Sequence, residues 1–229
     1  MTETYVVCGC KSWNRRVFDE ALSKLPGTWH FIAKKEELTA AALKKIGPRS
    51  IFFIHWSWMV PEEIFSAYEC VNFHMTDLPL GRGGSPLQNL ILLGKKDTVL
   101  TAHRMVAEVD AGPIYLKKPM SLAGTAQEIF ERSSALAATM IETIVKNHPE
   151  PLTQKGKVVL FKRRTPEQSE IPPGLSPAEL YDFIRMLDGE GYPAAFARCK
   201  GFRYELRNAR LINGRLEADV TVLPDSPHL

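Results

Sequence analysis

Short apolar runs alternate with stretches of helical character along the first half of the chain. Residues 5–8, 29–33 and 50–54 are mostly apolar, which predicts three short buried strands. Between them, residues 18–25 have apolar positions at helical spacing, and residues 36–46 are rich in Lys, Glu and Ala. Both stretches stop at a Pro-Gly or Gly-Pro pair, where helices commonly end. Strands that alternate with helices predict a doubly wound, mostly parallel α/β sheet.

The pattern continues with elements of both kinds. A fourth apolar run at residues 70–75 predicts another buried strand, and a loop rich in Gly and Pro follows it. We expect the next helix to begin at Ser85-Pro86, with Ser85 as its cap and Pro86 at the first helical position. Residues 97–106 and 114–122 predict two further strands joined by a hairpin-like return.

A long helix and a linker precede a smaller C-terminal part. A capping-box pattern predicts a helix over residues 125–146, and the Pro-flanked residues 149–156 indicate a linker. We therefore expect a main domain over residues 1–150 and a subdomain over residues 157–229. Asn213-Gly214 between two alternating runs predicts a β-hairpin, so the subdomain should be a small α+β unit with one helix and antiparallel strands.

Composition indicates an ordinary soluble domain. The chain has 229 residues, 45% of them hydrophobic and 24% charged, and can bury a core without disulfides or metals. Its net charge of +3 argues for neither a nucleic acid nor a membrane partner. The N-terminus lacks a signal-peptide pattern and no apolar stretch is long enough to span a bilayer, so we expect a cytoplasmic protein. The four cysteines lack the spacing of a zinc site, and the absence of GxGxxG after the first strand disfavours NAD binding.

Three polar residues stand out against this pattern: Asn72, His74 and Asp110. Asn72 and His74 alternate along a predicted strand, so they share a face near its C-terminal end, where open α/β sheets bind ligands. Asp110 begins a Gly/Pro turn and could partner the two buried polar side chains. Acyl transfer to an amine needs a donor to the oxyanion, a proton-transfer group and an orienting group, which these residues can supply. The alternative, which we consider the weaker one, is that they form a satisfied buried polar network without activity.

The order Asn-x-His, a Leu-Pro loop and Asp-x-Gly-Pro resembles the 10-formyltetrahydrofolate-dependent formyltransferases. The resemblance covers residues 50–122 and is weaker outside them. It implies a Rossmann-like catalytic domain, 10-formyltetrahydrofolate as co-substrate, no metal, and catalytic roles for Asn72, His74 and Asp110. Two residues outside the matched motif are alternatives for these roles. Glu108 could replace Asp110 as the acidic partner, and His55 could replace His74 as the catalytic histidine. We expect a capping or surface role for His55, and structural or solvated roles for the other histidines, which are His30, His103, His148 and His228.

The resemblance also implies binding residues. In this family two loops lie along the pterin of the folate, and the matching cofactor-binding positions are Trp58, Met59, Val60, Val106, Ala107, Glu108 and Val109. The large side chains of the first loop would serve equally well to cover the core. The glycine-rich loop suits an anionic substrate group, although a tight turn alone also explains its glycines. The expected substrate-binding residues are Asp77, Leu78, Pro79, Arg82, Gly83, Gly84 and Ser85.

The amine that accepts the formyl group is inferred from the C-terminal part. This part is similar to the tails of methionyl-tRNA and nucleotide-sugar formyltransferases, but it is too short for a full tRNA-binding barrel. Acidic neighbours also offset the basic residues 162–164. We therefore predict a nucleotide-linked amino sugar as the small-molecule partner, as in polysaccharide biosynthesis, with no nucleic acid and no membrane. The hairpin makes a homodimer conceivable.

Two kinds of alternative stay open at this point. The chain could formylate methionyl-tRNA or glycinamide ribonucleotide instead. It could also be a non-catalytic folate- or nucleotide-binding module, since a fold does not fix an activity.

Overall fold

The computed structural model describes residues 2–225. The chain forms two compact units, and neither is continuous in sequence. The first unit contains the chain up to Gly83, Thr98–Met120 and Glu131–Leu160; the second contains Gly84–Asp97, Ser121–Phe130 and the chain from Phe161 onward. These units have different boundaries from the predicted domains 1–150 and 157–229, which stay a prediction.

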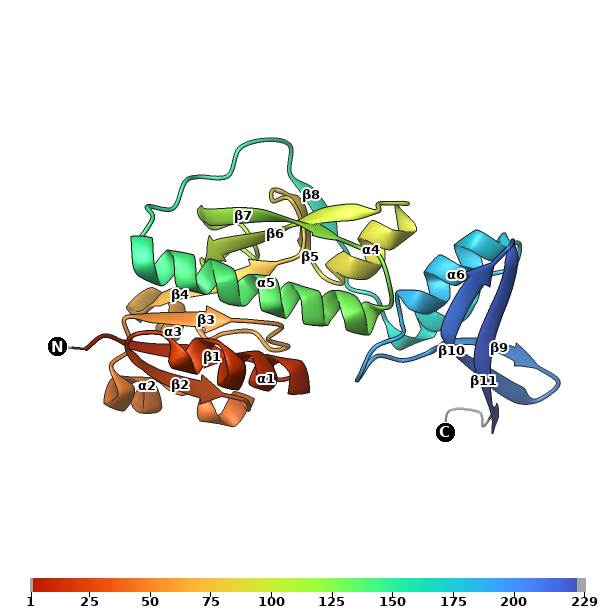
Figure 1. Cartoon of the computed structure of the whole chain (residues 1–229), viewed down its shortest axis with the longest axis horizontal. Helices are drawn as coiled ribbons and strands as arrows, with labels where there is room; N and C mark the ends of the chain where they lie inside the picture. The colour runs from red at the N-terminus through yellow and green to blue at the C-terminus, as the bar shows by residue number, and fades with distance from the viewer. Residues whose placement is uncertain (1, 226–229) are drawn as a thin grey trace. The chain divides into compact units, whose positions relative to one another are not determined.

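A six-stranded sheet organises the first unit (Figure 1). Its order is β2-β1-β3-β4-β6-β7, and the strands are β1 (Thr4–Cys8), β2 (Thr28–Ile32), β3 (Ser50–Phe53), β4 (Glu69–His74), β6 (Asp97–Arg104) and β7 (Ile114–Ser121). Strands β1 to β4 pair in parallel, whereas β4 and β6 are antiparallel. The predicted α/β class with a mostly parallel sheet is confirmed. Because β4 lies between β3 and β6, its side chains are flanked by neighbours on both sides.

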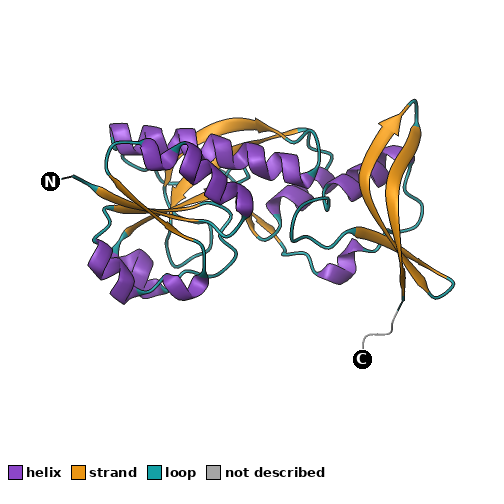
Figure 2. Ribbon diagram, turned by 60° about the horizontal axis from the view of Figure 1, so that its bottom comes forward, coloured by secondary structure: helices purple, strands orange, loops and turns teal. Residues whose placement is uncertain are grey.

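Helices cover both faces of this sheet (Figure 2). Helices α1 (Ser12–Glu20) and α5 (Ala126–Asn147) lie on one face and are joined by a 3.0 Å hydrogen bond from Asn14 to Ser134. Helices α2 (Ala40–Ile46) and α3 (Glu62–Ala67) lie on the other face. Their apolar residues pack on alternate residues of the strands in one buried cluster that includes Val6, Cys8, Leu43, Ile51, Phe53, Ile64 and Cys70.

Some helix boundaries differ from the sequence prediction. The stretch 18–25 is not one helix, because α1 ends at Glu20 and a separate 3-10 turn covers Leu22–Lys24. The helix expected from residue 36 begins only at Ala40, where the Thr39 hydroxyl accepts a 3.1 Å hydrogen bond from the Ala42 N–H. The capping box predicted for α5 is confirmed, because Thr125 and Glu128 exchange hydrogen bonds.

The glycine-rich stretch after β4, which was expected to be a loop, contains a short strand. Strand β5 (Leu80–Gly83) occupies part of it and pairs with β8 (Val159–Phe161). Ser85 precedes helix α4 (Pro86–Leu92) with a left-handed φ of 50°, and its hydroxyl accepts a 3.0 Å hydrogen bond from the Arg164 N–H. The predicted side-chain cap by Ser85 is therefore wrong, because its oxygen is engaged elsewhere.

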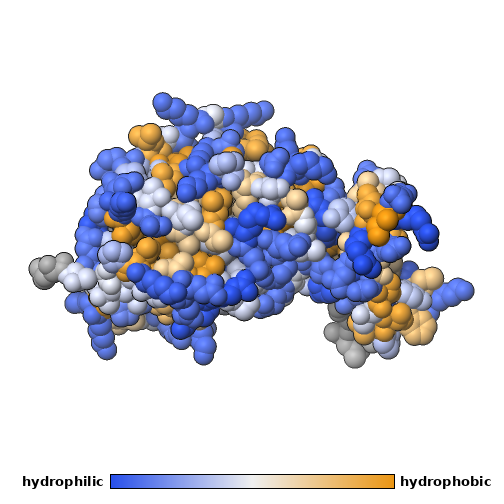
Figure 3. Space-filling view, viewed as in Figure 1, coloured by the Kyte–Doolittle hydropathy of each residue, from blue (hydrophilic) through white to orange (hydrophobic). Residues whose placement is uncertain are grey.

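The second unit contains α6 (Pro177–Arg185) and a three-stranded antiparallel sheet of β9 (Ala195–Cys199), β10 (Phe202–Ile212) and β11 (Arg215–Pro224). The predicted hairpin is confirmed, with Asn213-Gly214 between β10 and β11. Figure 3 shows hydrophobic residues gathered over this hairpin, where Phe202, Val220 and Val222 are each about half exposed. Within residues 2–225, no helix has both the length and the apolar character needed to cross a membrane.

Candidate active site

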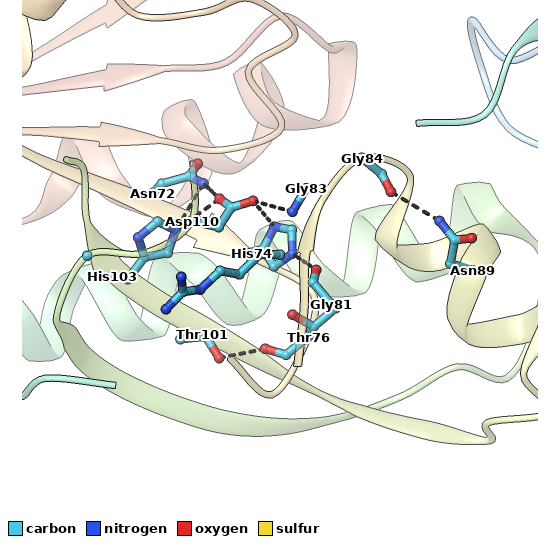
Figure 4. Close-up of polar contacts among 12 residues, drawn as sticks. Asn72, His74, Thr76, Gly81, Gly83, Gly84, Asn89, Thr101, His103 and Asp110 are labelled. Atoms are coloured by element: carbon cyan, nitrogen blue, oxygen red, sulfur yellow. Dashed lines mark hydrogen bonds and ion pairs between the residues drawn. The ribbon is translucent and has the colours of Figure 1, made fainter. Parts of the chain in front are cut away.

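Strand β4 carries two of the predicted catalytic side chains to one side of the sheet (Figure 4). Asn72 and His74 are two residues apart, so the alternation of the strand places them on the same face. His74 is the last residue of β4 and is 6% exposed, whereas Asn72 is only half-buried. Their side chains therefore emerge at the C-terminal end of a strand inside the sheet, as the sequence predicts.

Asp110 reaches the same point from the turn between β6 and β7. Its backbone has a left-handed φ of 53°, which is uncommon for a residue with a side chain. The turn packs tightly against the end of β6, where the Arg104 N–H donates a 2.9 Å hydrogen bond to the Pro113 carbonyl. A Cβ on Gly112 would lie 1.8 Å from the carbonyl oxygen of Arg104, so only glycine fits there. Steric exclusion therefore explains the glycine of the Asp-x-Gly-Pro pattern.

The carboxylate of Asp110 is the centre of the cluster (Figure 4). Its Oδ1 atom accepts a 3.3 Å hydrogen bond from Asn72 Nδ2, and its Oδ2 atom lies 3.5 Å from His74 Nδ1. The Gly83 N–H donates to the same Oδ2 atom at 2.9 Å. The structure therefore brings Asn72, His74 and Asp110 together. The rival acid, Glu108, forms an ion pair with Arg82 instead.

His103 joins this cluster and was not predicted to do so. It lies on β6 directly opposite Asn72, is 2% exposed, and places Nε2 3.3 Å from Asp110 Oδ1. Its Nδ1 lies 3.0 Å from the Arg104 carbonyl oxygen, so this nitrogen donates. A buried, hydrogen-bonded ring fits the expected structural role, but the sequence pattern did not predict its contact with Asp110. An antiparallel pairing of residues 97–106 with 70–75 in the right register would have revealed it.

The charges of the cluster follow from burial and from hydrogen bonds. Burial lowers the pKa of His74, although the Asp110 carboxylate and the bond to the Gly81 carbonyl oppose this. Burial raises the pKa of Asp110, but the hydrogen bond from His103, the charge of His74 and the Gly83 N–H outweigh it and bring the pKa to about 2. Asp110 is therefore a carboxylate at neutral pH and His74 a neutral imidazole.

The protonated nitrogen of His74 is fixed by its surroundings. His74 Nε2 lies 2.7 Å from the carbonyl oxygen of Gly81, which can only accept, so Nε2 carries the proton of the neutral ring. The basic nitrogen is consequently Nδ1, beside Asp110 Oδ2. A proton taken up at Nδ1 would lie between the imidazole and a carboxylate that stabilises the positive charge.

The two loops predicted to hold the folate present apolar side chains to solvent. Trp58 is 40% and Met59 76% exposed, while Val60 is buried. All of residues 106–109 are exposed, including Val106 and Val109. Both loops adjoin the same buried cluster, because Val60 belongs to it and Trp56 and Met105 pack against it. These loops therefore offer apolar surface to solvent, and their part in folate binding stays a prediction.

The predicted substrate-binding residues have diverse surroundings. Asp77 forms an ion pair with Lys117, Leu78 is 1% exposed, and the bond between Leu78 and Pro79 is cis. Arg82 is 9% exposed and bonds Glu108 and Gln154 rather than solvent. Gly83 donates its N–H to Asp110. Gly84 and Ser85 belong to the second unit.

No metal-ligating cluster of three or more His, Cys, Asp or Glu occurs among the described residues.

His55, the rival imidazole, belongs to a separate network. Its Nδ1 atom accepts a 3.1 Å hydrogen bond from Trp13 Nε1 and lies 3.3 Å from both Asn14 Nδ2 and Ser134 Oγ. Burial, and then the charge of Lys11, lowers the pKa of His55 to about 4. The predicted capping or surface role is wrong, because this side chain joins β3 to α1 and α5 inside the unit.

Comparisons with known proteins identify relatives in sequence and in fold. A family model described as the C-terminal domain of methionyl-tRNA formyltransferase matches residues 166–223. The solved structure of a methionyl-tRNA formyltransferase from Clostridium thermocellum is 44% identical, covers 97% of this chain and 99% of its own, and superposes with a TM-score of 0.92. HypX from Aquifex aeolicus, solved with tetrahydrofolic acid, shares the fold at 17% identity over 90% of this chain and 37% of its own, with a TM-score of 0.74.

A curated methionyl-tRNA formyltransferase from Lactobacillus johnsonii is 29% identical over 78% of this chain. The match covers 59% of that relative, so the chain spans little more than half the length of such curated proteins.

These relatives correct the predicted substrate and partner. The prediction of a nucleotide-linked amino sugar in polysaccharide biosynthesis, with no nucleic-acid partner, is contradicted by relatives whose names specify methionyl-tRNA. The error came from the C-terminal part, which was judged too short for tRNA. Residues 166–223 nevertheless match the C-terminal domain of the tRNA-directed enzymes. The length of the C-terminal part and the net charge of the chain were therefore poor guides to the acceptor.

Proposed function

This chain belongs to the folate-dependent formyltransferase family, and on that premise we propose that it transfers the formyl group of 10-formyltetrahydrofolate to the α-amino group of methionyl-tRNA. The main support is the 44% identity to a protein of that name over nearly the full length of both chains. The second support is the convergence of an amide, an imidazole and a carboxylate at one sheet edge.

The reaction joins the amine to the formyl carbon and releases tetrahydrofolate. The neutral amine nitrogen attacks the formyl carbon, and a tetrahedral intermediate forms with negative charge on the formyl oxygen. Its collapse breaks the bond from carbon to N10, which takes up a proton, while the amine loses one. The site must therefore stabilise an oxyanion and move a single proton.

Asn72 suits the oxyanion. Its amide has two N–H groups, and one of them donates to Asp110 Oδ1 at 3.3 Å. The Asn72 Nδ2 atom also lies 3.3 Å from His103 Nε2, and the formyl oxygen would take up the N–H that faces this ring. An amide held in this way loses little free energy to reorientation when the charge develops.

His74 and Asp110 suit the proton transfer. The basic Nδ1 atom of His74 accepts the amine proton, and the carboxylate of Asp110 at 3.5 Å stabilises the resulting imidazolium. The proton then passes to the leaving N10 of the folate. Tetrahydrofolate would lie along residues 58–60 and 106–109, whose exposed apolar side chains can pack against a pterin.

A formylation assay with 10-formyltetrahydrofolate and purified protein tests the proposal. Methionyl-tRNA, deacylated tRNA, free methionine and glycinamide ribonucleotide are offered in parallel, and the formylated product is identified by mass spectrometry. We expect product from methionyl-tRNA alone. Product from glycinamide ribonucleotide alone would overturn the acceptor, and folate binding without any product would favour a non-catalytic binding module.

A further inference from the structure

Gln154 holds the turn that carries Asp110. Its Nε2 atom donates to the carbonyl oxygen of Asp110 at 2.7 Å and to that of Gly112 at 2.8 Å. One amide group therefore uses both of its N–H bonds on the two carbonyls that flank Ala111. Gln154 comes from the segment after α5, 44 residues from Asp110 in sequence, so this is a long-range tie and not part of the local turn.

Arg82 determines the orientation of this amide. The Oε1 atom of Gln154 accepts from Arg82 Nε at 3.2 Å and from Nη2 at 2.9 Å, and Arg82 Nη1 donates to Glu108 at 2.8 Å. A guanidinium only donates, so the oxygen of Gln154 must face it and the NH₂ group must face the two carbonyls. Arg82 is 9% exposed, which leaves this arrangement little freedom.

Strand β5, which contains Arg82, also holds the carboxylate of Asp110. Gly83, the neighbour of Arg82, donates its N–H to Asp110 Oδ2 at 2.9 Å. Asp110 is thus fixed at its main chain through Gln154 and at its side chain through Gly83. Its left-handed φ of 53° requires such support, because a residue with a Cβ does not favour that region.

We infer that Gln154 is a positioning residue for formyl transfer, which acts by holding the Asp110 carboxylate beside His74. The inference rests on the proposed function. Gln154 lies behind the turn and has no part in the chemistry itself. When its two N–H donors are lost, the turn relaxes, Asp110 withdraws from His74, and the oxyanion donor Asn72 loses its anchor.

Two substitutions separate the donor role from other roles. Gln154→Met removes every hydrogen bond of the amide at similar volume, whereas Gln154→Glu keeps an acceptor for Arg82 but cannot donate to the turn. We expect both to lower kcat about 100-fold, as misplacement by about 1 Å can do, with little change in KM for the folate. Full kcat in Gln154→Glu would overturn the inference, because the residue would then serve only as an anchor for Arg82.

Gln88→Met is the matched control. Gln88 is a buried glutamine in the second unit whose Nε2 atom donates to the Met186 carbonyl at 3.1 Å, so the same substitution removes the same kind of bond away from Asp110. Urea unfolding and circular dichroism report the loss of stability in each variant. We expect both Met variants to be less stable than wild type, but only Gln154→Met to lose kcat. An equal loss of kcat in Gln88→Met would show that the effect is a general loss of stability.

The pKa of His74, followed by NMR of its ring, is a readout that needs no turnover. Asp110 raises this pKa, so its withdrawal in Gln154→Met should lower the pKa of His74 below the wild-type value. The pKa should be unchanged in Gln88→Met. An unchanged pKa of His74 in both variants would overturn the inference even if kcat fell. If wild type forms no product from methionyl-tRNA, the proposed function fails, while the NMR comparison still decides the role of Gln154.

Discussion

Two imidazoles lie at the ends of adjacent parallel strands, and their partners give them opposite characters. His74 ends β4 and faces a carboxylate, whereas His55 follows β3 and faces the N–H and O–H groups of Trp13, Asn14 and Ser134. Burial lowers the pKa of both rings. Only His74 has an acidic neighbour that opposes this effect and can stabilise a positive charge.

The difference separates the imidazole that we propose for proton transfer from the structural one. His55 uses its Nδ1 atom as an acceptor from neutral donors, and its protonation would break that network. His74 keeps Nδ1 beside Asp110, where an added proton strengthens the contact. Position at a strand end and burial are therefore insufficient criteria, and the charge of the nearest partner decides the role.

His74→Asn should produce the largest effect on activity. It removes the only basic atom beside Asp110 that we assign to the proton transfer, and we expect kcat for methionyl-tRNA to fall about 10⁴-fold. Folate affinity, measured by fluorescence titration, should be nearly unchanged because the predicted folate loops are intact. His55→Asn is the parallel variant, with an expected fall in kcat of less than about threefold. Equal losses in the two variants would erase the distinction between the imidazoles.

Asp110→Asn should produce the second largest effect, with an expected loss in kcat of about 10³-fold. The carboxylate raises the pKa of His74, so without it that pKa falls further. If neutral His74 is the base, the acidic limb of the pH profile of kcat should move to lower pH in this variant. Asp19→Asn removes an exposed carboxylate of the same unit that pairs with Arg15, and should alter neither kcat nor the profile. A shift to higher pH would contradict the assignment of His74 as base.

The sequence predicted the part of the site that depends on local pattern. Strand alternation was sufficient to place Asn72 and His74 on one face, and the Asp-x-Gly-Pro motif led to Asp110. His103 and Gln154 were not predicted. The position of His103 depends on the register of β6 on β4, and Gln154 bonds a residue 44 positions away in sequence, so neither role leaves a local signal in the sequence. The Ser85 cap failed for the same reason, because a distant backbone N–H from Arg164 occupies its hydroxyl.

Asn72→Ala should be the mildest of the three substitutions in the cluster, with a fall in kcat of about 10²-fold through loss of an oxyanion donor. The amide does not titrate, so the pH profile should keep its wild-type position. This distinguishes the variant from Asp110→Asn, in which both the rate and the profile change. A displaced profile in Asn72→Ala would mean that the amide acts through Asp110 and not on the substrate.

His55→Gln should have the smallest effect on activity and should act on stability instead. At pH 7 the substitution moves the accepting atom away from the position of Nδ1, where its partners donate, which costs about 1–3 kcal/mol in the free energy of unfolding. The folded pKa of about 4 lies below the ordinary value of 6.5, so the stability that neutral His55 contributes is fully present above pH 6.5. It is lost as the pH falls from 6.5 through 4, because the unfolded chain binds the proton first.

The free energy of unfolding of wild type relative to His55→Gln should therefore fall by about 3 kcal/mol between pH 7 and pH 4, which is enough to close the gap of about 1–3 kcal/mol expected at pH 7. Urea unfolding at several pH values measures this gap, and the slope due to His74 cancels because both proteins contain that residue. His30→Gln, at an exposed histidine of β2, is the control and should leave the free energy of unfolding at pH 7 as in wild type. A gap that stays constant over this range would show that His55 is not held neutral, and the contrast with His74 would then rest on activity alone.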